Sequence, residues 1–479
     1  MMEPNPLIFR AYDIRGRAGP DLNETVAEVV GQAFGTLISA NGSNKVAVGS
    51  DNRLSSPSLT AAIIRGLISS GCQVLDIGLA TSPLLYFTVA HDRLAGGISI
   101  TGSHNPPEEN GFKLIGPGGI PLSSDEIQEV RRRIERSDFS VGRGAVEEYD
   151  AGEPYLSFIT DYVLGKNGPV LPKTKIVVDG GNGVASLFAP KLLRSLGAEV
   201  IEQYCDLDGR FPNRGLDPAD ERNLAPVADR VLAVGADFGF AFDGDGDRLG
   251  MVDEAGTRYP AEYVVILLAR DFLSRHPGQR VLFDVRASQI VEMDIASHGG
   301  IPYMYKTGHS LIKREMRDRG IGFAGEASGH MFFGEDYFGI DDALIAAGKV
   351  ASIVSNSRAT VREHFADLPR FASSPEFQIP ADDASKFDIA RRVGDYFRSR
   401  YQTVDIDGAR VKFEQGWALI RASNTNPVLI LRCEARDEVA LSSILSELSP
   451  VLSNYLSDGA LAPLREYEQQ LRSSQAGDR

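Results

Sequence analysis

The chain has 479 residues, which is long enough for three or four domains. Its 43% hydrophobic and 24% charged residues are typical of soluble globular proteins and exclude extended disorder or fibrous structure. The net charge of −15 disfavours nucleic acid and anionic membranes as partners. An anionic ligand would therefore need a site where Arg, Lys and backbone N–H groups are locally concentrated.

The three cysteines, Cys72, Cys205 and Cys433, are odd in number and widely spaced, which predicts reduced thiols rather than a disulfide framework. Residues 1–16 carry no basic segment followed by a long apolar stretch, and no apolar run approaches 18 residues. We therefore expect a cytoplasmic, unanchored protein that is a monomer or a small homo-oligomer.

A strand–helix–strand pattern recurs three times along the chain. The first strand of each copy runs from a basic residue to a polar turn, at 45–51, 175–181 and 280–286. A glycine, Gly71, Gly197 or Gly299, then ends each helix before the second strand, as a left-handed helix cap would. Third strands follow at 96–101, 236–242 and 320–325. The pattern predicts three related α/β domains with mixed sheets.

The most unusual loops of the chain follow the third strand of each copy, at 102–107, 243–248 and 326–330. Ligands of open α/β sheets bind beyond the carboxyl ends of the strands. Three such domains around one cleft could each contribute one loop, so we expect a composite active site.

Polar stretches containing Gly or Pro suggest where these domains end. We predict four domains, at residues 1–150, 151–255, 256–367 and 368–479. The first would carry the loop that contains Ser103 (the serine loop), the second the loop with three aspartates (the acidic loop) and the third the loop at 326–330. The fourth would carry a C-terminal site. The last is expected to be a smaller α+β domain, with a helix at 383–400, strands between 403 and 435, and a helix at 437–455.

The first loop, Thr101-Gly-Ser-His-Asn-Pro, places a serine and a histidine side by side on a rigid turn. Ser103 in such a position suits a nucleophile or a covalently phosphorylated hydroxyl. Taken alone, the loop is equally compatible with Ser103 and Asn105 simply stabilising a turn. Lys113 lies close enough in sequence to approach the same hydroxyl.

The second loop, Asp243-Gly-Asp-Gly-Asp-Arg, is more specific. Three carboxylates, from Asp243, Asp245 and Asp247, can converge on one hard cation, and three unpaired carboxylates would otherwise repel. A calcium EF-hand is disfavoured because Arg248 stands where that loop needs glycine and because strands flank the segment. Mg²⁺ is the better candidate, with Arg248 adding positive charge beside it.

The third loop, Glu326-Ala-Ser-Gly-His, offers a carboxylate, a hydroxyl and an imidazole, which suit sugar hydroxyl groups and proton transfer. His104, His309 and His330 all fall in glycine-containing loops, although the chain has only seven histidines.

A fourth loop, at 421–427, joins two apolar strands and combines arginine with hydroxyl and amide side chains, which predicts a phosphate cradle. A plain polar turn is the alternative. Arg15 is a weaker candidate for an anion contact.

Five ordered motifs together resemble the α-D-phosphohexomutase superfamily, in its bacterial phosphomannomutase/phosphoglucomutase branch, over essentially the whole chain. They are Phe9-Arg-Ala-Tyr-Asp-Ile-Arg-Gly, Thr101-Gly-Ser-His-Asn-Pro-Pro, Asp243-Gly-Asp-Gly-Asp-Arg, Gly325-Glu-Ala-Ser-Gly-His and Arg421-Ala-Ser-Asn-Thr-Asn-Pro. The resemblance implies four domains around a cleft and the conversion of hexose 6-phosphate to hexose 1-phosphate. A phosphoserine, Mg²⁺ and a hexose 1,6-bisphosphate intermediate would take part.

The resemblance also implies roles for individual residues. Ser103 would be the phosphoserine, beside His104 and Lys113, and would share the metal with the three aspartates. Arg15 and Arg248 would assist at the transfer site. His309 and His330 would contact substrate and be candidates for acid–base work. Glu326 and Ser328 would bind sugar hydroxyls. The phosphate that is not transferred would be bound by Arg421, Ser423, Asn424 and Thr425.

Two positions depart from the pattern of the related mutases. Ala327 replaces a methionine that is common in the sugar loop, and we expect little effect. Arg286 stands where lysine usually reaches the substrate, so the preference between mannose and glucose could differ.

Three other functions are compatible with parts of the pattern. A phosphoglucosamine mutase would usually carry glutamine in the sugar loop and a Ser-Gly-Thr phosphate loop, unlike Ala327 and Ser423-Asn-Thr. A serine-dependent metal phosphatase would release free phosphate. A non-catalytic sugar-phosphate or Ca²⁺ binding protein would not need Ser103 together with all three aspartates.

Overall fold

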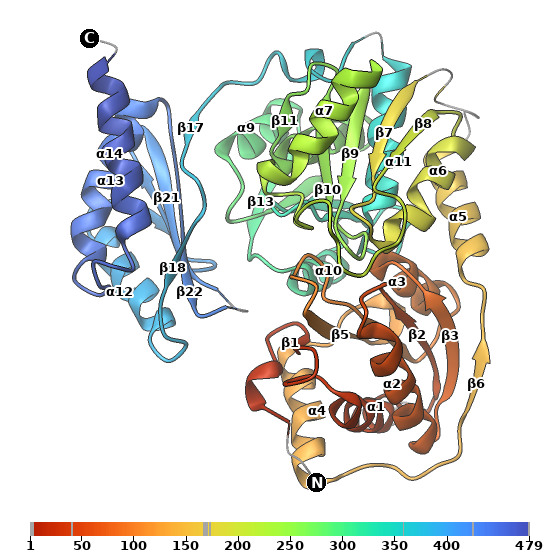
Figure 1. Ribbon diagram of the computed structural model, residues 1–479. Coiled ribbons are helices and arrows are strands. Elements are labelled where there is room, and N and C mark those ends of the chain that lie inside the picture. The colour runs from red at the N-terminus through yellow and green to blue at the C-terminus, as the bar shows by residue number, and fades with distance from the viewer. Residues whose placement is uncertain are drawn as a thin grey trace. The chain divides into compact units, whose positions relative to one another are not determined.

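The structure is a computed structural model that describes residues 4–39, 42–165, 171, 174–357, 359–423 and 426–477. The chain divides into two compact units (Figure 1). The larger unit comprises residues 1–283, 291–303 and 308–366, and the C-terminal unit comprises residues 284–290, 304–307 and 367–479. The predicted boundaries at residues 150, 255 and 367 stay predictions.

The first domain of the larger unit is a six-stranded sheet in the order β1-β5-β4-β2-β3-β6. Strand β2 pairs in parallel with β3 and β4, whereas β4 and β5 are antiparallel, so the sheet is mixed. Side chains alternate between the faces of a strand, and Val46 and Val48 enter a core that α1, α2 and α4 also supply. Its elements are β1 (Ile14–Arg17), α1 (Glu24–Ser39), β2 (Lys45–Ser50), α2 (Ser56–Ser69), β3 (Gln73–Leu79), α3 (Ser82–His91), β4 (Gly96–Ile100), β5 (Glu109–Ile115), α4 (Ser124–Arg136) and β6 (Ala145–Glu148).

The second domain repeats this plan with the strand order β11-β10-β9-β7-β8. Strand β7 is parallel to both β8 and β9, and the hairpin β9–β10 carries the acidic loop at its tip. Its elements are α5 (Gly152–Leu164), β7 (Lys175–Asp179), α6 (Ala189–Ser195), β8 (Glu199–Gln203), α7 (Ala225–Val234), β9 (Phe238–Phe242), β10 (Leu249–Asp253) and β11 (Arg258–Tyr259).

The third domain has the strand order β13-β12-β14-β15-β16. Its parallel pair β12–β14 is followed by an antiparallel hairpin, β14–β15, whose turn holds Glu326 to His330. Its elements are α8 (Ala261–Arg275), β12 (Arg280–Asp284), α9 (Gln289–Ser297), β13 (Ile301–Tyr305), α10 (His309–Arg319), β14 (Phe323–Gly325), β15 (Met331–Phe333), β16 (Ile340–Asp341) and α11 (Ala343–Asn356). Short 3₁₀ helices lie at Pro6–Ile8, Pro117–Gly119, Val184–Leu187, Glu221–Leu224 and Glu363–Phe365.

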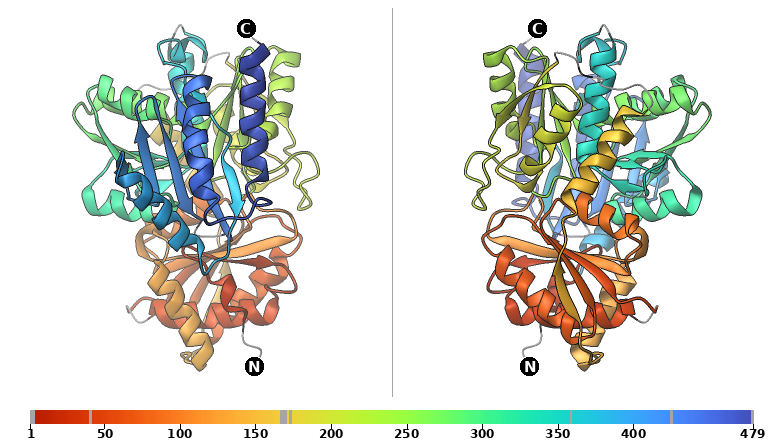
Figure 2. Two further views of the ribbon diagram at one scale, coloured as in Figure 1. Left: turned by 90° about the vertical axis from the view of Figure 1, so that its left-hand side faces the viewer. Right: turned by 90° about the vertical axis from the view of Figure 1, so that its right-hand side faces the viewer.

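The C-terminal unit contains an antiparallel sheet in the order β17-β22-β21-β20-β19, with β18 also pairing to β22. One apolar core joins the sheet to its helices, and α13 and α14 run side by side (Figure 2). Its elements are β17 (Ala372–Ser373), β18 (Phe377–Pro380), α12 (Lys386–Arg398), β19 (Gln402–Val404), β20 (Ala409–Phe413), β21 (Gly416–Ala422), β22 (Val428–Ala435), α13 (Glu438–Leu452) and α14 (Ala462–Gly477).

The predicted α/β class with three related mixed sheets and a smaller C-terminal domain is confirmed. The three glycines expected to end helices do adopt positive φ, at 97°, 101° and 75° for Gly71, Gly197 and Gly299. Several elements were not predicted, and β6 and α14 are two of them. Strand β6 lies in a stretch whose polar composition suggested a linker and forms an exposed edge beside β3. Helix α14 follows the last predicted helix and adds Leu464 to the core.

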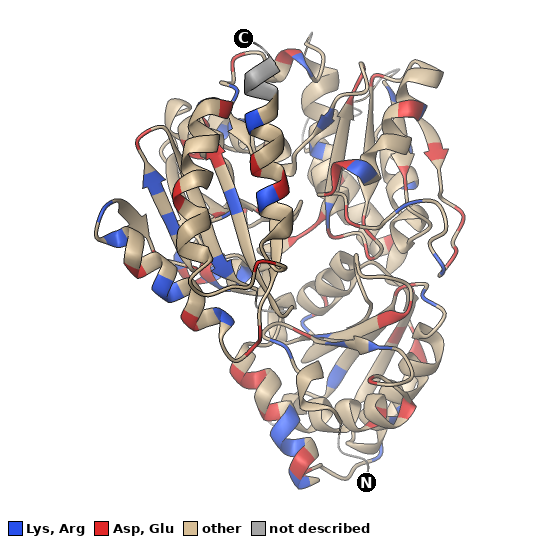
Figure 3. Ribbon diagram, turned by 60° about the vertical axis from the view of Figure 1, so that its left-hand side comes forward, with Lys and Arg blue, Asp and Glu red and all other residues tan. Residues whose placement is uncertain are grey.

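Acidic and basic residues are interspersed along many helices, strands and loops (Figure 3), so the excess of negative charge is not confined to one element. Helix α4 shows basic and acidic segments next to one another (Figure 3), where Arg131 pairs with Glu135 and Arg132 with Glu129. Among the described residues, no helix is both long enough and apolar enough to cross a membrane. All three cysteines are free, as expected.

A buried carboxylate ties the third domain to α5. Asp342 caps α11 by accepting from the N–H groups of Leu344 and Ile345, and it also accepts from the hydroxyls of Tyr155 and Tyr337 at 2.8 and 2.7 Å. Burial raises the pKa of Asp342 to about 6. Its folded-state pKa thus lies above the unfolded value of about 3.9.

The pKa of Asp342 predicts a pH-dependent stability. Because the folded state holds this proton more tightly, the group favours folding below about pH 4, and that contribution is lost as the pH rises through about 6. The full difference is on the order of 3 kcal/mol. Thermal unfolding of the wild type and Asp342→Asn between pH 4.5 and 7.5 should show the wild type losing stability relative to the variant as the pH rises. Parallel curves would contradict this assignment.

Candidate active site

Ser103 lies just beyond β4 on the serine loop and is buried, with 2% of its surface exposed. Its φ of 51° places it in the left-handed region, which costs free energy for any residue other than glycine. The conformation is held by its own N–H, which donates to Thr101 Oγ1 at 2.8 Å. In this position Ser103 Oγ is 2.9 Å from Asp243 Oδ2 and 3.2 Å from His104 Nδ1.

Arg53 holds the backbone of the serine loop in place by hydrogen bonds. Its side chain is fully buried and donates to the carbonyl oxygens of Ser103, Asn105, Pro106 and Glu109. The carboxylate of Asp51 balances the charge of Arg53 at 3.0 Å. A guanidinium is suited to this task because it offers five donors in a fixed plane.

Asp51 connects the same pair to the other side of the loop. It accepts from Thr101 Oγ1 at 2.8 Å and from the Gly102 N–H at 3.2 Å. A side chain on Gly102 would collide with the Arg53 guanidinium, whose central carbon lies 2.5 Å from the expected Cβ position. The residue pair and the glycine together determine the shape of the loop.

The three aspartates of the acidic loop converge, because their ligand atoms lie within 4.8 Å of one another and all three side chains are fully buried. Asp243 Oδ1 accepts from the N–H groups of Asp247 and Arg248, which directs its other oxygen to Ser103. Within the described part of the chain, Asp245 Oδ1 and Asp247 Oδ1 are buried without a hydrogen-bond partner. Oxygen atoms of this kind fit a hard divalent cation, and the strands β9 and β10 flank the loop.

Lys113 provides the main counter-charge for this loop. Its Nζ lies 2.6 Å from both Asp245 Oδ2 and Asp247 Oδ2, and 3.1 Å from Ser82 Oγ. Although burial opposes the charged form, Asp245 and Asp247 raise the pKa of Lys113 well above its ordinary value. Lys113 comes from β5 of the first domain, so this contact joins the first two domains.

Two of these carboxylates, Asp243 and Asp245, differ in their affinity for protons. Burial, followed by the charges of Asp245 and Asp247, raises the pKa of Asp243 well above its ordinary value. Burial acts in the same direction on Asp245, but Lys113 outweighs it and holds the pKa of Asp245 below the ordinary value. Asp243 therefore takes up a proton more readily than Asp245.

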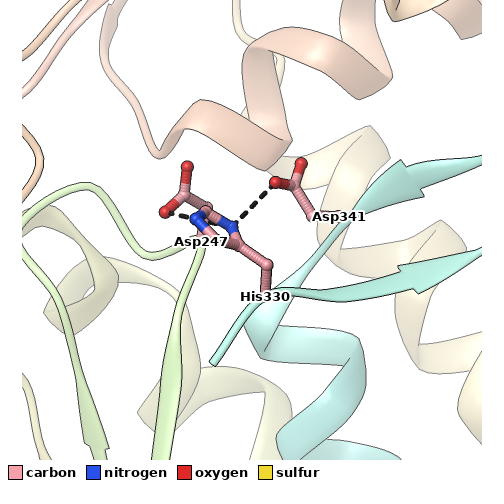
Figure 4. A group of neighbouring side chains, drawn as sticks. All are labelled: Asp247, His330 and Asp341. Atoms are coloured by element: carbon pink, nitrogen blue, oxygen red, sulfur yellow. Dashed lines mark ion pairs between the residues drawn. The ribbon is translucent and has the colours of Figure 1, made fainter. Parts of the chain in front are cut away.

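His330 lies between two carboxylates, as Figure 4 shows. Its Nδ1 is 2.9 Å from Asp341 Oδ2 on β16 and 3.7 Å from Asp247 Oδ1 on the acidic loop. On its opposite side, Nε2 accepts from Arg248 Nε at 3.1 Å. Asp247, His330 and Asp341 also form a second group that could hold a metal ion. However, Asp341 already has a cationic partner, because Lys313 Nζ lies 2.6 Å from Asp341 Oδ1.

Two further histidines lie in the same region. The imidazole of His309 stacks on that of His330 with ring centres 5.5 Å apart. Burial and the charge of Lys313 lower the pKa of His309 well below its ordinary value, and burial with Arg248 and Arg15 does the same for His104. Both rings are therefore neutral near neutral pH and can accept a proton.

The remaining predicted residues of the larger unit surround this centre. Arg15 donates to Asp13 and, at 3.1 Å, to Asn105 of the serine loop. Glu326 Oε1 accepts from the Gly308 N–H at 2.7 Å, next to His309, and the turn that carries Ser328 is closed by the bond from Glu326 N–H to His330 O. Loops of three domains thus meet at Ser103.

The other predicted contacts belong to the C-terminal unit. Arg286 follows β12 and pairs with Asp284, while Arg421 lies in β21 and pairs with Asp407. Ser423 follows that strand, and its Oγ accepts from the Asn426 N–H. The predicted phosphate contacts Asn424 and Thr425 fall outside the described residues.

Several residues of the centre were not predicted from the sequence, namely Asp51, Arg53, Ser82, Lys313 and Asp341. The sequence did contain one signal for Arg53, because an Asp-x-Arg triplet ends the first strand in both the first and the third repeat, as Asp51-Asn-Arg53 and Asp284-Val-Arg286. Lys313 and Asp341 lie outside any motif and are recognisable only through their contacts.

The chain matches, in order, the four domains of one family. They are described as phosphoglucomutase/phosphomannomutase alpha/beta/alpha domains I, II and III, at residues 6–141, 153–256 and 260–371, and as the C-terminal domain at residues 378–450.

Similar proteins agree with this match. A phosphomannomutase/phosphoglucomutase of Pseudomonas aeruginosa is 42% identical over 91% of this chain and 93% of its own. A phosphoglucomutase of Neisseria meningitidis is 39% identical over 93% and 97%. The crystal structure of a phosphoglucomutase/phosphomannomutase family protein from Burkholderia thailandensis superposes with a TM-score of 0.87 at 38% identity, covering 94% of this chain and 98% of the other.

Fold and site define a four-domain α/β enzyme with a buried serine facing an acidic loop. The chain belongs to the phosphoglucomutase/phosphomannomutase family. The resemblance found in the sequence is confirmed.

The acidic loop predicts proton-linked cation binding. Because the pKa of Asp243 is raised, protons compete with a cation for this carboxylate, so affinity should weaken as the pH falls and binding should be accompanied by proton release. Calorimetric Mg²⁺ titrations in two buffers of different protonation enthalpy would count the protons. Asp243→Asn should bind more weakly and lose this release, whereas Asp253→Asn, which alters another buried carboxylate, should behave as the wild type. Equal proton release by the wild type and Asp243→Asn would refute the link.

Proposed function

We propose that this enzyme interconverts hexose 6-phosphate and hexose 1-phosphate, with mannose and glucose as sugars, through a phosphoserine at Ser103 and a hexose 1,6-bisphosphate intermediate. The observation that carries the proposal is the buried Ser103 Oγ held 2.9 Å from Asp243, beside three converging carboxylates. Names of relatives over 30% identical, phosphomannomutase/phosphoglucomutase and phosphoglucomutase, support it.

The proposed reaction has two symmetrical transfers. In the first, the phosphoryl group leaves Ser103 Oγ for the free hydroxyl of the sugar phosphate, a histidine takes the hydroxyl proton, and Ser103 Oγ takes up a proton as it is released. The bisphosphate then turns round and its other phosphoryl group returns to Ser103. In this step the Ser103 hydroxyl gives up its proton and the released sugar oxygen gains one, which restores the phosphoserine. Catalysis of phosphoryl transfer depends mainly on positioning and on charge stabilisation.

The residues of the centre divide these tasks. Asp243, Asp245 and Asp247, with the phosphoserine oxygen, would hold Mg²⁺, which when bound would neutralise charge on the transferring group. Lys113, Arg15 and Arg248 would supply further positive charge. His330 and His309 are the candidates for proton transfer to and from the sugar, and His104 adjoins the serine oxygen.

Further residues would recognise the sugar and the phosphate. Glu326 and Ser328 would bind sugar hydroxyls, and Arg286 would make a further contact with the sugar. Arg421 and Ser423, with Asn424 and Thr425, would bind the phosphate that is not transferred, in either orientation of the substrate. Because the chain is acidic overall, the negatively charged sugar phosphate would have to be attracted locally by Arg286 and Arg421.

Mutase assays on mannose, glucose and glucosamine 1-phosphates, primed with a trace of hexose 1,6-bisphosphate, would test the proposal. We expect turnover of mannose and glucose 1-phosphates, and Ser103→Ala should abolish it while ligand binding persists. Ser70→Ala, which alters another buried serine outside the site, should remain active. Turnover of glucosamine 1-phosphate alone would favour a phosphoglucosamine mutase, and release of free phosphate without isomerisation would favour a phosphatase.

The contacts of Arg53 predict a loss of rate rather than of substrate binding. Arg53→Lys keeps the charge but cannot bind four carbonyl oxygens at once. We expect kcat to fall about 10- to 100-fold, with KM within about threefold, because displacing a reacting group by 1 Å can cost about 100-fold. Arg270→Lys is the control, since Arg270 also pairs with a carboxylate and donates to a carbonyl outside the site. Equal kcat values for wild type and Arg53→Lys would contradict the expectation.

A further inference from the structure

Two arginines expected to contact different parts of the substrate lie in the same compact unit. Arg286 follows a strand of the third domain in sequence, whereas Arg421 belongs to the C-terminal sheet. The C-terminal unit nevertheless includes residues 284–290 and 304–307 together with residues 367–479. The sugar contact and the phosphate contact therefore share one unit.

The backbone of residues 284–290 is attached to the C-terminal sheet. Arg410, which is buried and lies over the Trp417 ring at 3.7 Å, donates to the carbonyl oxygens of Val285 and Ala287 at 2.6 and 2.8 Å. Arg432 donates to the carbonyl oxygen of Arg286 at 2.9 Å. These bonds fix where the Arg286 side chain begins.

A continuous set of four hydrogen bonds then joins the two arginines. Arg286 Nε donates to Asp284 Oδ2 at 2.7 Å, and Thr307 Oγ1 donates to the same oxygen at 3.0 Å. The Thr307 N–H donates to Asp407 Oδ2 at 3.2 Å, and Arg421 Nε donates to that oxygen at 3.0 Å. Thr307 is the central member because its hydroxyl and its amide reach the two carboxylates separately.

The arrangement orients both guanidinium groups in the same manner. Each is bound by a carboxylate at Nε, which fixes the plane of the group and directs its Nη atoms away from that carboxylate. Arg286 Nη1 lies in addition 3.6 Å from Glu376 Oε2. Asp284 is fully buried and Asp407 is 15% exposed, so solvent screens these pairs only weakly. A phosphate that binds Arg421 therefore also affects Asp407, which holds Arg421. Through Thr307 the effect reaches Asp284 and Arg286.

We infer that Thr307 is a positioning residue that couples Arg286 to Arg421, so that the sugar and phosphate contacts act as one clamp. This inference rests on the proposed function, because the ligand roles of both arginines are part of it. The coupling does not require Thr307 to touch the substrate.

Substitution of Thr307 tests the link. Thr307→Val keeps the branched shape and the amide but removes the hydroxyl bond to Asp284. Loss of one such bond predicts a KM for mannose or glucose 1-phosphate about 3- to 10-fold higher, with kcat within about twofold. Thr307→Ser should restore the wild-type KM because it keeps the hydroxyl. Thr403→Val is the matched control in the same unit, since Thr403 Oγ1 donates only to a nearby carbonyl.

A mutant cycle separates coupling from general damage. In the wild-type background, the combined effect of Arg286→Lys and Arg421→Lys on kcat/KM should differ from the product of the single effects by at least about threefold. In the Thr307→Val background the effects should multiply. Coupling that survives Thr307→Val, effects that already multiply in the wild type, or a KM that Thr307→Ser does not restore would each overturn the inference.

The same cycle can be measured by calorimetric binding of glucose 1-phosphate, which needs no turnover. Coupled binding in a protein without mutase activity would reject the proposed function and support the role of Thr307. Mutase activity without coupling would reject the role of Thr307 and leave the proposed function intact.

Discussion

The site depends on balancing a high density of buried negative charge. Asp243, Asp245, Asp247 and Asp341 are all fully buried in the larger unit, and a buried carboxylate without a partner would cost several kcal/mol. Lys113 forms ion pairs with Asp245 and Asp247, and Lys313 forms one with Asp341. Since Lys113 comes from the first domain and the aspartates it binds from the second, these buried ion pairs also join the two domains. The acidic loop is therefore part of the interface between these domains.

Much of this arrangement could be predicted because it follows from chain topology. The three unusual loops each follow a third strand, and parallel strands place such loops at one edge of a sheet. Ser103 meets Asp243, and His330 meets Asp247, as loops gathered round one centre require. The parts that escaped prediction are single residues whose meaning comes only from contacts distant in sequence, such as Lys313 against Asp341. A lone lysine within a helix gives no pattern from which this contact could be expected.

Hydrogen bonds between segments distant in sequence show a second limit of reasoning from sequence. The predicted third domain at 256–367, like the family match at 260–371, follows the continuity of the chain. Contacts instead group residues 284–290 and 304–307 with the C-terminal unit, because Arg410 and Arg432 bind the backbone there. A loop can thus belong to one domain by chain continuity and to another by its hydrogen bonds. Thr307 gains its importance from that second membership.

One local arrangement recurs in the three related domains, with different partners in each. At the end of the first strand an aspartate binds an arginine in each copy, as Asp51 with Arg53, Asp179 with Arg214, and Asp284 with Arg286. The first two arginines are almost completely buried and donate to carbonyl oxygens of the serine loop and, through Phe242, of the segment entering the acidic loop. Arg286 keeps its aspartate but is 14% exposed, which fits a role toward a ligand. The aspartate fixes the guanidinium in every copy, whereas the partners of the remaining donors differ. Those of Arg53 and Arg214 bind backbone carbonyl oxygens, and Arg286 Nη1 lies 3.6 Å from Glu376 Oε2.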